Sequence, residues 1–90
     1  MTEQKAIELA SQFQRDSGRT TKVSTVRRIG QDMIDAMEEA HGKTDLSDCP
    51  DWMKPFPHWA ILFDRGLNSV PAHHVIVVYD DGSVAETPAL

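Results

Sequence analysis

The sequence predicts an α+β domain in which one N-terminal helix packs on an antiparallel sheet of three or four strands. Three observations lead to this prediction. Residues 2–18 place apolar side chains at the spacing of one helical face, whereas residues 59–65 and 74–79 are strand-length apolar segments. The pair Asp81-Gly82 then separates the second apolar segment from a third, as in a tight β-hairpin. A second helix is expected near Gln31–His41.

The chain is expected to form a single domain over residues 1–90. Its 90 residues are 40% hydrophobic, and a core of this size cannot be divided and still offset the entropy of ordering two separate parts. A domain this small buries roughly 60–65% of the surface that its unfolded chain exposes. Contact with a partner or a second copy would therefore add usefully to its stability.

The N-terminal segment "TEQKAIELASQFQRDSG" predicts an amphipathic helix. Its apolar residues recur at positions i, i+3, i+4 and i+7. They are Ala6, Leu9, Ala10 and Phe13. Thr2 is expected to cap the start of the helix, and Gly18 to end it by adopting a left-handed conformation.

The segment "RTTKVSTVRRIG" allows two interpretations. Its β-branched residues favour a strand over about Thr21–Ile29, with Gly30 as the break before the helix Gln31–His41. The spacing of Val26, Ile29, Met33 and Met37 also continues a helical stripe, so the alternative is one helix from about Ser24 to His41. We expect the strand followed by the helix.

Residues 43–58, "KTDLSDCPDWMKPFPH", are expected to form a loop because they contain three prolines, three Asp residues and a Ser. The same loop holds large apolar side chains, which either fold back on the core or meet a partner. With the first residue of the next strand they form a candidate partner surface. Its members are Trp52, Met53, Phe56 and Trp59.

The rest of the chain predicts three strands, Trp59–Arg65, His74–Tyr79 and Ser83–Thr87. Successive side chains of a strand point to opposite faces, so His73 and His74 cannot chelate one ion together. The expected core combines both helices with the two longer strands. It consists of Leu9, Phe13, Ile34, Met37, Ile61, Phe63, Val75 and Val77.

Charge and cysteine content exclude several classes of partner and indicate a cellular compartment. A formal charge of −5 repels phosphate backbones and anionic lipids, so neither a nucleic acid nor a membrane is the expected partner. No apolar run approaches the roughly 20 residues that cross a bilayer. The lone Cys49 cannot form an internal disulfide and the N-terminal segment is polar, so we expect a cytoplasmic protein.

No motif for catalysis, cofactor binding or metal binding is evident, and none of these is expected. A zinc site would recruit His41, Cys49, His58 and either His73 or His74, but these lack the paired spacing of structural zinc ligands. A thiolate site would pair Cys49 with a histidine and with Asp48 or Asp51. Paired carboxylates among Asp64, Asp80 and Asp81 are ordinary at strand ends and turns.

The segments "PFPHWAILFDR" and "HHVIVVYDDGSVAETPAL", after an N-terminal amphipathic helix, resemble the small bacterial YrhB-like proteins grouped with immunity proteins. The likeness covers about the last third of the chain. It is carried by Trp59, by Val75 to Val78, and by Asp80, Gly82 and Val84. The resemblance implies a helix packed on a cystatin-like antiparallel sheet, in a cytoplasmic protein that neutralises a toxin or otherwise binds a protein, with no catalytic residues.

The leading functional hypothesis is therefore a small non-enzymatic protein-binding module. The first alternative is a metal- or cysteine-dependent enzyme that uses Cys49 and the histidines. The second is a homo-oligomer, such as a dimer, whose exposed strand edges pair with each other.

Overall fold

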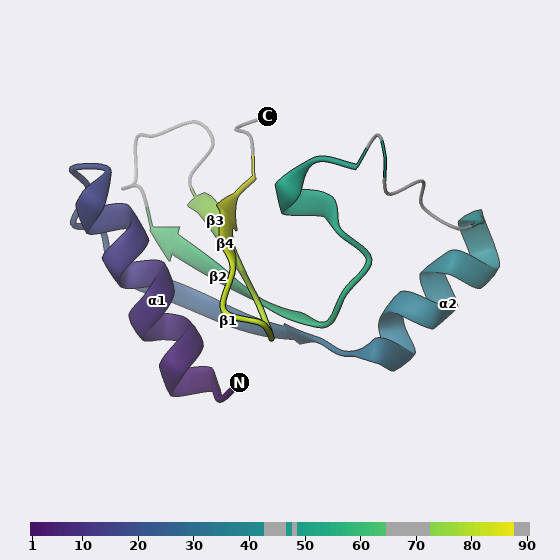
Figure 1. Cartoon of the computed structure of the whole chain (residues 1–90). Coiled ribbons are helices and arrows are strands. Elements are labelled where there is room, and N and C mark those ends of the chain that lie inside the picture. The colour runs from purple at the N-terminus through teal and green to yellow at the C-terminus, as the bar shows by residue number, and fades with distance from the viewer. Residues whose placement is uncertain (43–46, 48, 65–72, 88–90) are drawn as a thin grey trace.

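The computed structural model of the chain describes residues 1–42, 47, 49–64 and 73–87, and it has the predicted α+β architecture (Figure 1). Its elements are α1 (Glu3–Asp16), β1 (Val23–Ile29), α2 (Gln31–His41), the 3-10 turn η2 (Asp51–Met53), β2 (His58–Asp64), β3 (His73–Tyr79) and β4 (Val84–Glu86). The strand-then-helix interpretation of residues 21–41 is confirmed, and the single helix from Ser24 is wrong.

Helix α1 begins and ends where the sequence predicts. The Thr2 hydroxyl accepts a hydrogen bond of 3.1 Å from the Lys5 backbone N–H, which satisfies one of the free donors at the helix start. At the other end, Gly18 adopts a φ of +82°, a conformation that costs glycine little.

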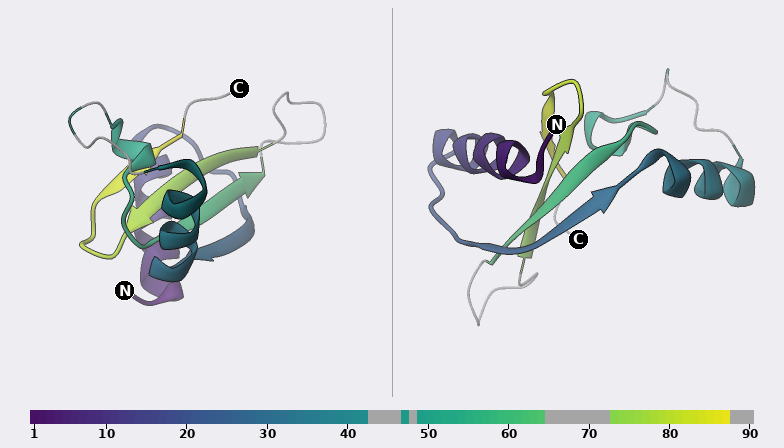
Figure 2. Two further views of the ribbon diagram at one scale, coloured as in Figure 1. Left: turned by 90° about the vertical axis from the view of Figure 1, so that its right-hand side faces the viewer. Right: turned by 90° about the horizontal axis from the view of Figure 1, so that it is seen from below.

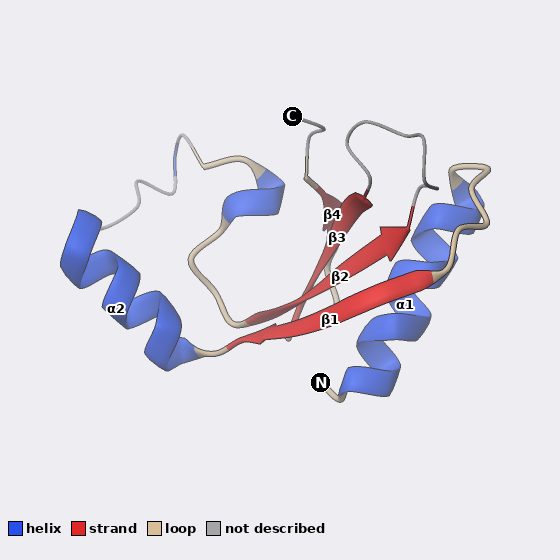
Figure 3. Cartoon of the chain, turned by 180° about the vertical axis from the view of Figure 1, so that it is seen from behind, coloured by secondary structure: helices blue, strands red, loops and turns tan. Residues whose placement is uncertain are grey.

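The four strands form one antiparallel sheet in the order β1-β2-β3-β4 (Figure 3). Val26 of β1 pairs with Ile61 of β2, and Ile61 pairs with Ile76 of β3. The hairpin between β3 and β4 is present as predicted, with a positive φ of +92° at Gly82. Each strand is thus next to its neighbour in sequence, with α2 and η2 inserted between β1 and β2.

Helix α1 covers one face of this sheet and encloses the main core. Ala6 and Ala10, both fully buried, bring the helix backbone close to the strands. The sheet contributes four fully buried side chains to this cluster. They are Ile61, Phe63, Ile76 and Val78. The predicted core positions Ile61 and Phe63 are confirmed, while Leu9 and Phe13 pack at its margin.

Four predicted core positions differ from the prediction or lie outside the α1 core, and one of them is Ile34, which is buried on α2 instead. Met37 is 60% exposed, so its assignment to the core is wrong. Val77 is buried and Val75 half-buried, but alternation along β3 places both on the sheet face opposite α1. Helix α1 lies on the Ile76 face instead, and β3 is apolar on both faces, so its own pattern did not distinguish them.

The opposite face of the sheet is partly covered by the η2 turn. The Tyr79 hydroxyl donates a 2.7 Å hydrogen bond to the Asp51 carbonyl and accepts one of 3.0 Å from the Lys54 backbone N–H. Tyr79 itself is only 3% exposed. The proline-rich loop therefore folds back on the sheet at this point.

Helix α2 stands beyond the end of the sheet, on the side opposite α1 (Figure 2). It follows Gly30 directly from β1 and stops at Gly42, where φ is +85°. Ile34, at 5% exposure, is its one buried residue. Within the described ranges, no helix combines the length and the apolar character that crossing a bilayer requires.

Candidate protein-binding surface

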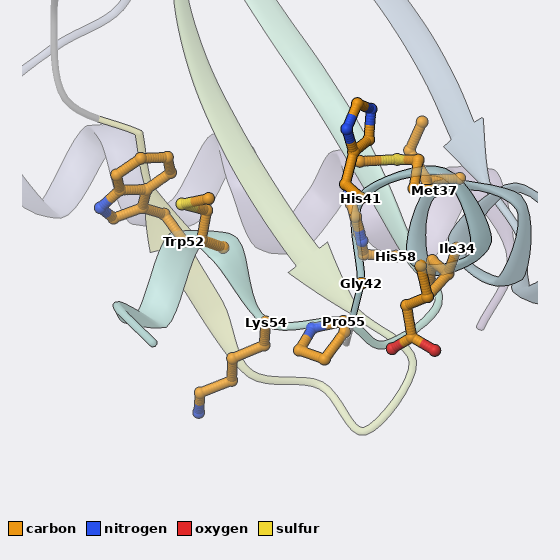
Figure 4. Close-up of a pocket in the computed structure, with 11 residues that line it drawn as sticks. Ile34, Met37, His41, Gly42, Trp52, Lys54, Pro55 and His58 are labelled. Carbon is orange, nitrogen blue, oxygen red and sulfur yellow. The ribbon is translucent and has the colours of Figure 1, made fainter. Parts of the chain in front are cut away.

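A groove with a volume of about 490 Å³ lies between α2 and the turn at residues 52–55 (Figure 4). Helix α2 supplies one wall through Ile34, Met37, Glu38 and His41. The turn supplies the other through Trp52, Met53, Lys54 and Pro55. Ile29 and His58 line it from the ends of β1 and β2.

The turn wall is held in place by backbone hydrogen bonds and by one thiol. The Met53 N–H donates to the Pro50 carbonyl over 3.0 Å, which closes the 3-10 turn. The Cys49 thiol lies 3.1 Å from the Met53 carbonyl and donates to it. Together with the bonds from Tyr79, these contacts fix the backbone that carries Trp52.

His58 is oriented by its neighbours. Its Nδ1 lies 2.8 Å from the Phe56 carbonyl oxygen, which can only accept, so Nδ1 carries the proton in this bond. Its ring centroid lies 5.4 Å from that of Tyr79. His58 thus links the groove to the tyrosine that anchors the turn.

Helix α2 also exposes an apolar stripe beside the groove. The stripe follows the i, i+3, i+4, i+7 spacing that helices normally bury. It consists of Met33, Ala36, Met37 and Ala40, all exposed. Met33 is 49% and Met37 60% exposed, and Met53 across the groove is 54% exposed. We call this stripe, together with Trp52 and Met53, the methionine surface.

The other side of α2 is acidic. Between Gln31 and His41 the helix contains four carboxylates and neither Lys nor Arg. They are Asp32, Asp35, Glu38 and Glu39. Glu38 is half-buried at the groove, whereas Lys54 on the facing wall lies 3.6 Å from Asp51. The apolar stripe is therefore bordered by negative charge on one flank.

The predicted partner surface is only partly brought together. Trp52 and Met53 line the groove, whereas Phe56, 46% exposed, lines a second hollow of about 290 Å³ next to Pro57. Trp59 lies on the opposite sheet face, packed against the α1 core, with the Arg28 guanidinium carbon 5.2 Å from its ring centroid. Sequence reasoning missed Met33 and Met37, although their spacing with Ala36 and Ala40 is visible in the sequence.

Three of the residues considered for metal binding or nucleophilic catalysis, Cys49, His58 and His74, make contacts within the fold. Within residues 1–42, 47, 49–64 and 73–87, no group of three or more His, Cys, Asp or Glu side chains is arranged to hold a metal ion. The His74 ring is stacked on Phe63, with centroids 5.1 Å apart. Asp48 and the side chain of His73 lie outside the described part of the chain.

The acidic residues near the hairpin are engaged in folding contacts. Asp81 Oδ1 accepts hydrogen bonds from the Ser83 hydroxyl at 2.6 Å and from the Ser83 N–H at 2.8 Å, and these bonds lower the pKa of Asp81 below its usual range. Asp80 is paired with Arg28, whose hydrogen bond lowers the Asp80 pKa. Asp64 ends β2 and is exposed.

Comparison of the chain with protein families, with curated proteins and with solved structures finds no match.

Proposed function

We propose that this chain is a non-enzymatic protein-binding module and that its partner docks on the methionine surface. One observation carries the proposal: a helix that stands off the sheet exposes a complete apolar stripe next to an apolar groove. A stripe of this spacing is normally buried against another element. Here the missing element would come from another molecule.

The residue types support this role. Methionine side chains are flexible and polarisable and adapt to different apolar surfaces, and tryptophan is enriched among the residues that dominate binding energy. Complete burial of a methionine side chain contributes about 1.5–3 kcal/mol. Met33, Met37 and Met53 are each about half exposed, so a partner can still gain from covering them.

The length of α2 gives a second reason. A helix of 11 residues is marginal in water on its own, because nucleation is costly and few hydrogen bonds follow. Tertiary packing supplies most helix stability in proteins, and α2 buries Ile34 alone. A partner on the exposed stripe would add the packing that α2 lacks within the chain.

Toxin neutralisation in the cytoplasm, the role that the resemblance to the YrhB-like proteins implies, is one form of such binding. It requires a tight contact surface and no catalytic group. The methionine surface would supply that contact without using Cys49 or the histidines as reactive groups.

Affinity capture from the native cell tests the proposal. The double variant Met33→Gln/Met37→Gln keeps side-chain length and helix propensity but makes the stripe polar. Val23→Thr is the matched control, because Val23 is an exposed apolar residue (37%) at the far end of β1, about 20 Å along the strand from Ile29, where the chain turns into α2.

The proposal predicts that a protein captured by the wild type and by Val23→Thr is lost from the methionine variant. Equal capture by all three forms would contradict it. The far-ultraviolet circular dichroism of the three forms, expected to be the same, excludes unfolding as the cause of a loss.

A further inference from the structure

Resting on this proposed function, we infer that the methionine surface receives a basic amphipathic helix of the partner, with apolar anchors flanked by Lys and Arg. The inference follows from three properties of α2: the shape of its apolar stripe, the charge beside it, and the cost of pairing α2 with a second copy.

The shape of the apolar stripe favours a helical partner. Helix α2 is about 16 Å long at 1.5 Å per residue, and its stripe repeats on successive turns from Met33 to Ala40. Small Ala36 and Ala40 alternate with long Met33 and Met37, which gives the ridges and grooves through which helices pack. A partner helix with anchors at i, i+3, i+4 and i+7 matches this surface.

The charge favours Lys and Arg beside those anchors. At 100° per residue, Asp32 and Glu39 lie beside Ala36 on one flank of the apolar stripe. Asp35 and Glu38 lie further around the helix, on the side opposite the methionines. The helix has no cation among them, and Lys54 across the groove already lies near Asp51. Among the described residues, no ion pair joins these carboxylates to a cation. Basic side chains on the partner would therefore meet negative charge, which raises the association rate and selects against acidic partners.

A second copy of the chain fits this surface poorly. In a two-fold antiparallel pair of helices, each flank faces the same flank of the other copy. The carboxylates of α2 would then face carboxylates, between two chains that each carry a formal charge of −5. Like-charge contacts of this kind cost energy, whereas a basic helix removes the cost.

Designed peptides test the inference directly. The probe is a synthetic helix of Leu and Lys with Leu at i, i+3, i+4 and i+7, and its twin replaces every Lys with Glu. Titration calorimetry with the full chain is expected to give at least about tenfold tighter binding of the basic peptide, with an affinity that falls as salt rises.

Matched variants locate the charge effect. Glu38→Gln/Glu39→Gln removes two negative charges from α2, and Glu3→Gln/Glu8→Gln removes two from the exposed side of α1. The α2 pair is expected to weaken binding of the basic peptide by about 3- to 10-fold, whereas the α1 pair changes it by less than about twofold.

Each of the other possible results contradicts a defined part of the inference or of the proposed function. If both peptides bind equally, or if both variant pairs have equal effects, the partner is not basic. Docking on the methionine surface would not be contradicted by that result. Failure of both peptides, with native capture still dependent on Met33 and Met37, overturns the helix inference alone. Sedimentation showing a dimer that Met33→Gln/Met37→Gln dissociates replaces the basic helix with a second copy. If capture from the native cell does not depend on Met33 and Met37 either, the proposed function is overturned as well.

Discussion

Arg28 and Asp80 are joined by two parallel hydrogen bonds, Nη1 to Oδ1 at 2.7 Å and Nη2 to Oδ2 at 2.9 Å. Arg28 belongs to edge strand β1, and Asp80 directly follows β3, so the pair spans β2. Between them the guanidinium lies over the ring of Trp59 on β2. This clamp holds the end of β1 from which α2 projects.

The clamp predicts a specific coupling between two substitutions. Both side chains are more than a third exposed, so solvent screens the pair, and Arg28→Gln and Asp80→Asn should each reduce the free energy of unfolding by only about 0.5–1 kcal/mol. The double variant should lose little more than either single variant, as urea denaturation will measure. Fully additive losses would show that the two residues act independently.

The same pair predicts how stability depends on pH. The hydrogen bond from Arg28 is the main cause that lowers the pKa of Asp80 in the folded chain. Its stabilising effect is therefore present above the ordinary aspartate pKa of about 3.9 and is lost as the pH falls through the folded value. Asp80→Asn should remove this part of the acid dependence. If the free energy of unfolding of Asp80→Asn fell at acidic pH as steeply as that of the wild type, the pair would not be the source of this pH dependence.

Tyr79 predicts a link between the turn and the sheet. Tyr79→Phe removes the partners of the Asp51 carbonyl and the Lys54 N–H, so the free energy of unfolding should fall by about 1–2 kcal/mol. The indole resonance of Trp52 should shift as the turn loosens, while that of Trp59 stays in place. Shifts confined to Trp59 would show that Tyr79 does not anchor the groove wall.

Titration of the phenol gives an independent check. Burial raises the pKa of Tyr79 above its ordinary value of about 10. Its contribution to stability is thus full below the ordinary pKa and disappears as the pH rises through the folded value. Tyr79 is the chain's one tyrosine, so phenolate absorbance reports on it alone. A midpoint at or below that of free tyrosine would contradict its burial.

Phe63 and Met37 give opposite predictions for the same kind of truncation. Phe63→Ala empties a fully buried site beneath α1 and should cost about 3–5 kcal/mol. Met37→Ala removes an exposed side chain and leaves a good helix former, so the change should stay within about 0.5 kcal/mol. Thermal and urea unfolding distinguish them, and a large loss in Met37→Ala would mean that α2 packs on the core.

Gln14 predicts a second pH effect, introduced by mutation. Its amide nitrogen donates to the Thr21 carbonyl at 2.7 Å, and its oxygen accepts from the Thr21 hydroxyl at 2.7 Å, with the residue only 4% exposed. In Gln14→Glu an ionised carboxylate would face that carbonyl, so the pKa of the new group should be raised and stability should fall as the pH rises through it. The exposed control Gln4→Glu should show no such fall. Identical pH profiles for both variants would contradict the buried bond.

Local patterns predicted much of this fold because neighbouring residues determine them. The cap at Thr2, the helix stop at Gly18 and the turn at Gly82 follow from side-chain hydrogen bonding and from the freedom of glycine. The β-branched residues of β1 likewise outweighed the helical spacing that runs on into Met33.

The candidate site was harder to predict because it depends on the relative placement of elements. Met37 fits a buried stripe by spacing, and only the position of α2 beyond the sheet leaves it exposed. Trp52 and Trp59 are close in sequence, yet Trp59 shares the strand face of Ile61 and Phe63. That alternation was visible in the sequence and indicated that Trp59 packs on the core.

The most direct test of the methionine surface is the methyl NMR spectrum of methionine-labelled chain, recorded alone and in an extract of the native cell. The chain has four methionines, of which Met33, Met37 and Met53 belong to the surface and Met1, 40% exposed at the start of the chain, does not. We predict that the signals of the three surface methionines shift or broaden in the extract while that of Met1 remains sharp. Unchanged signals from all three, or an equal change in Met1, would contradict a partner on this surface.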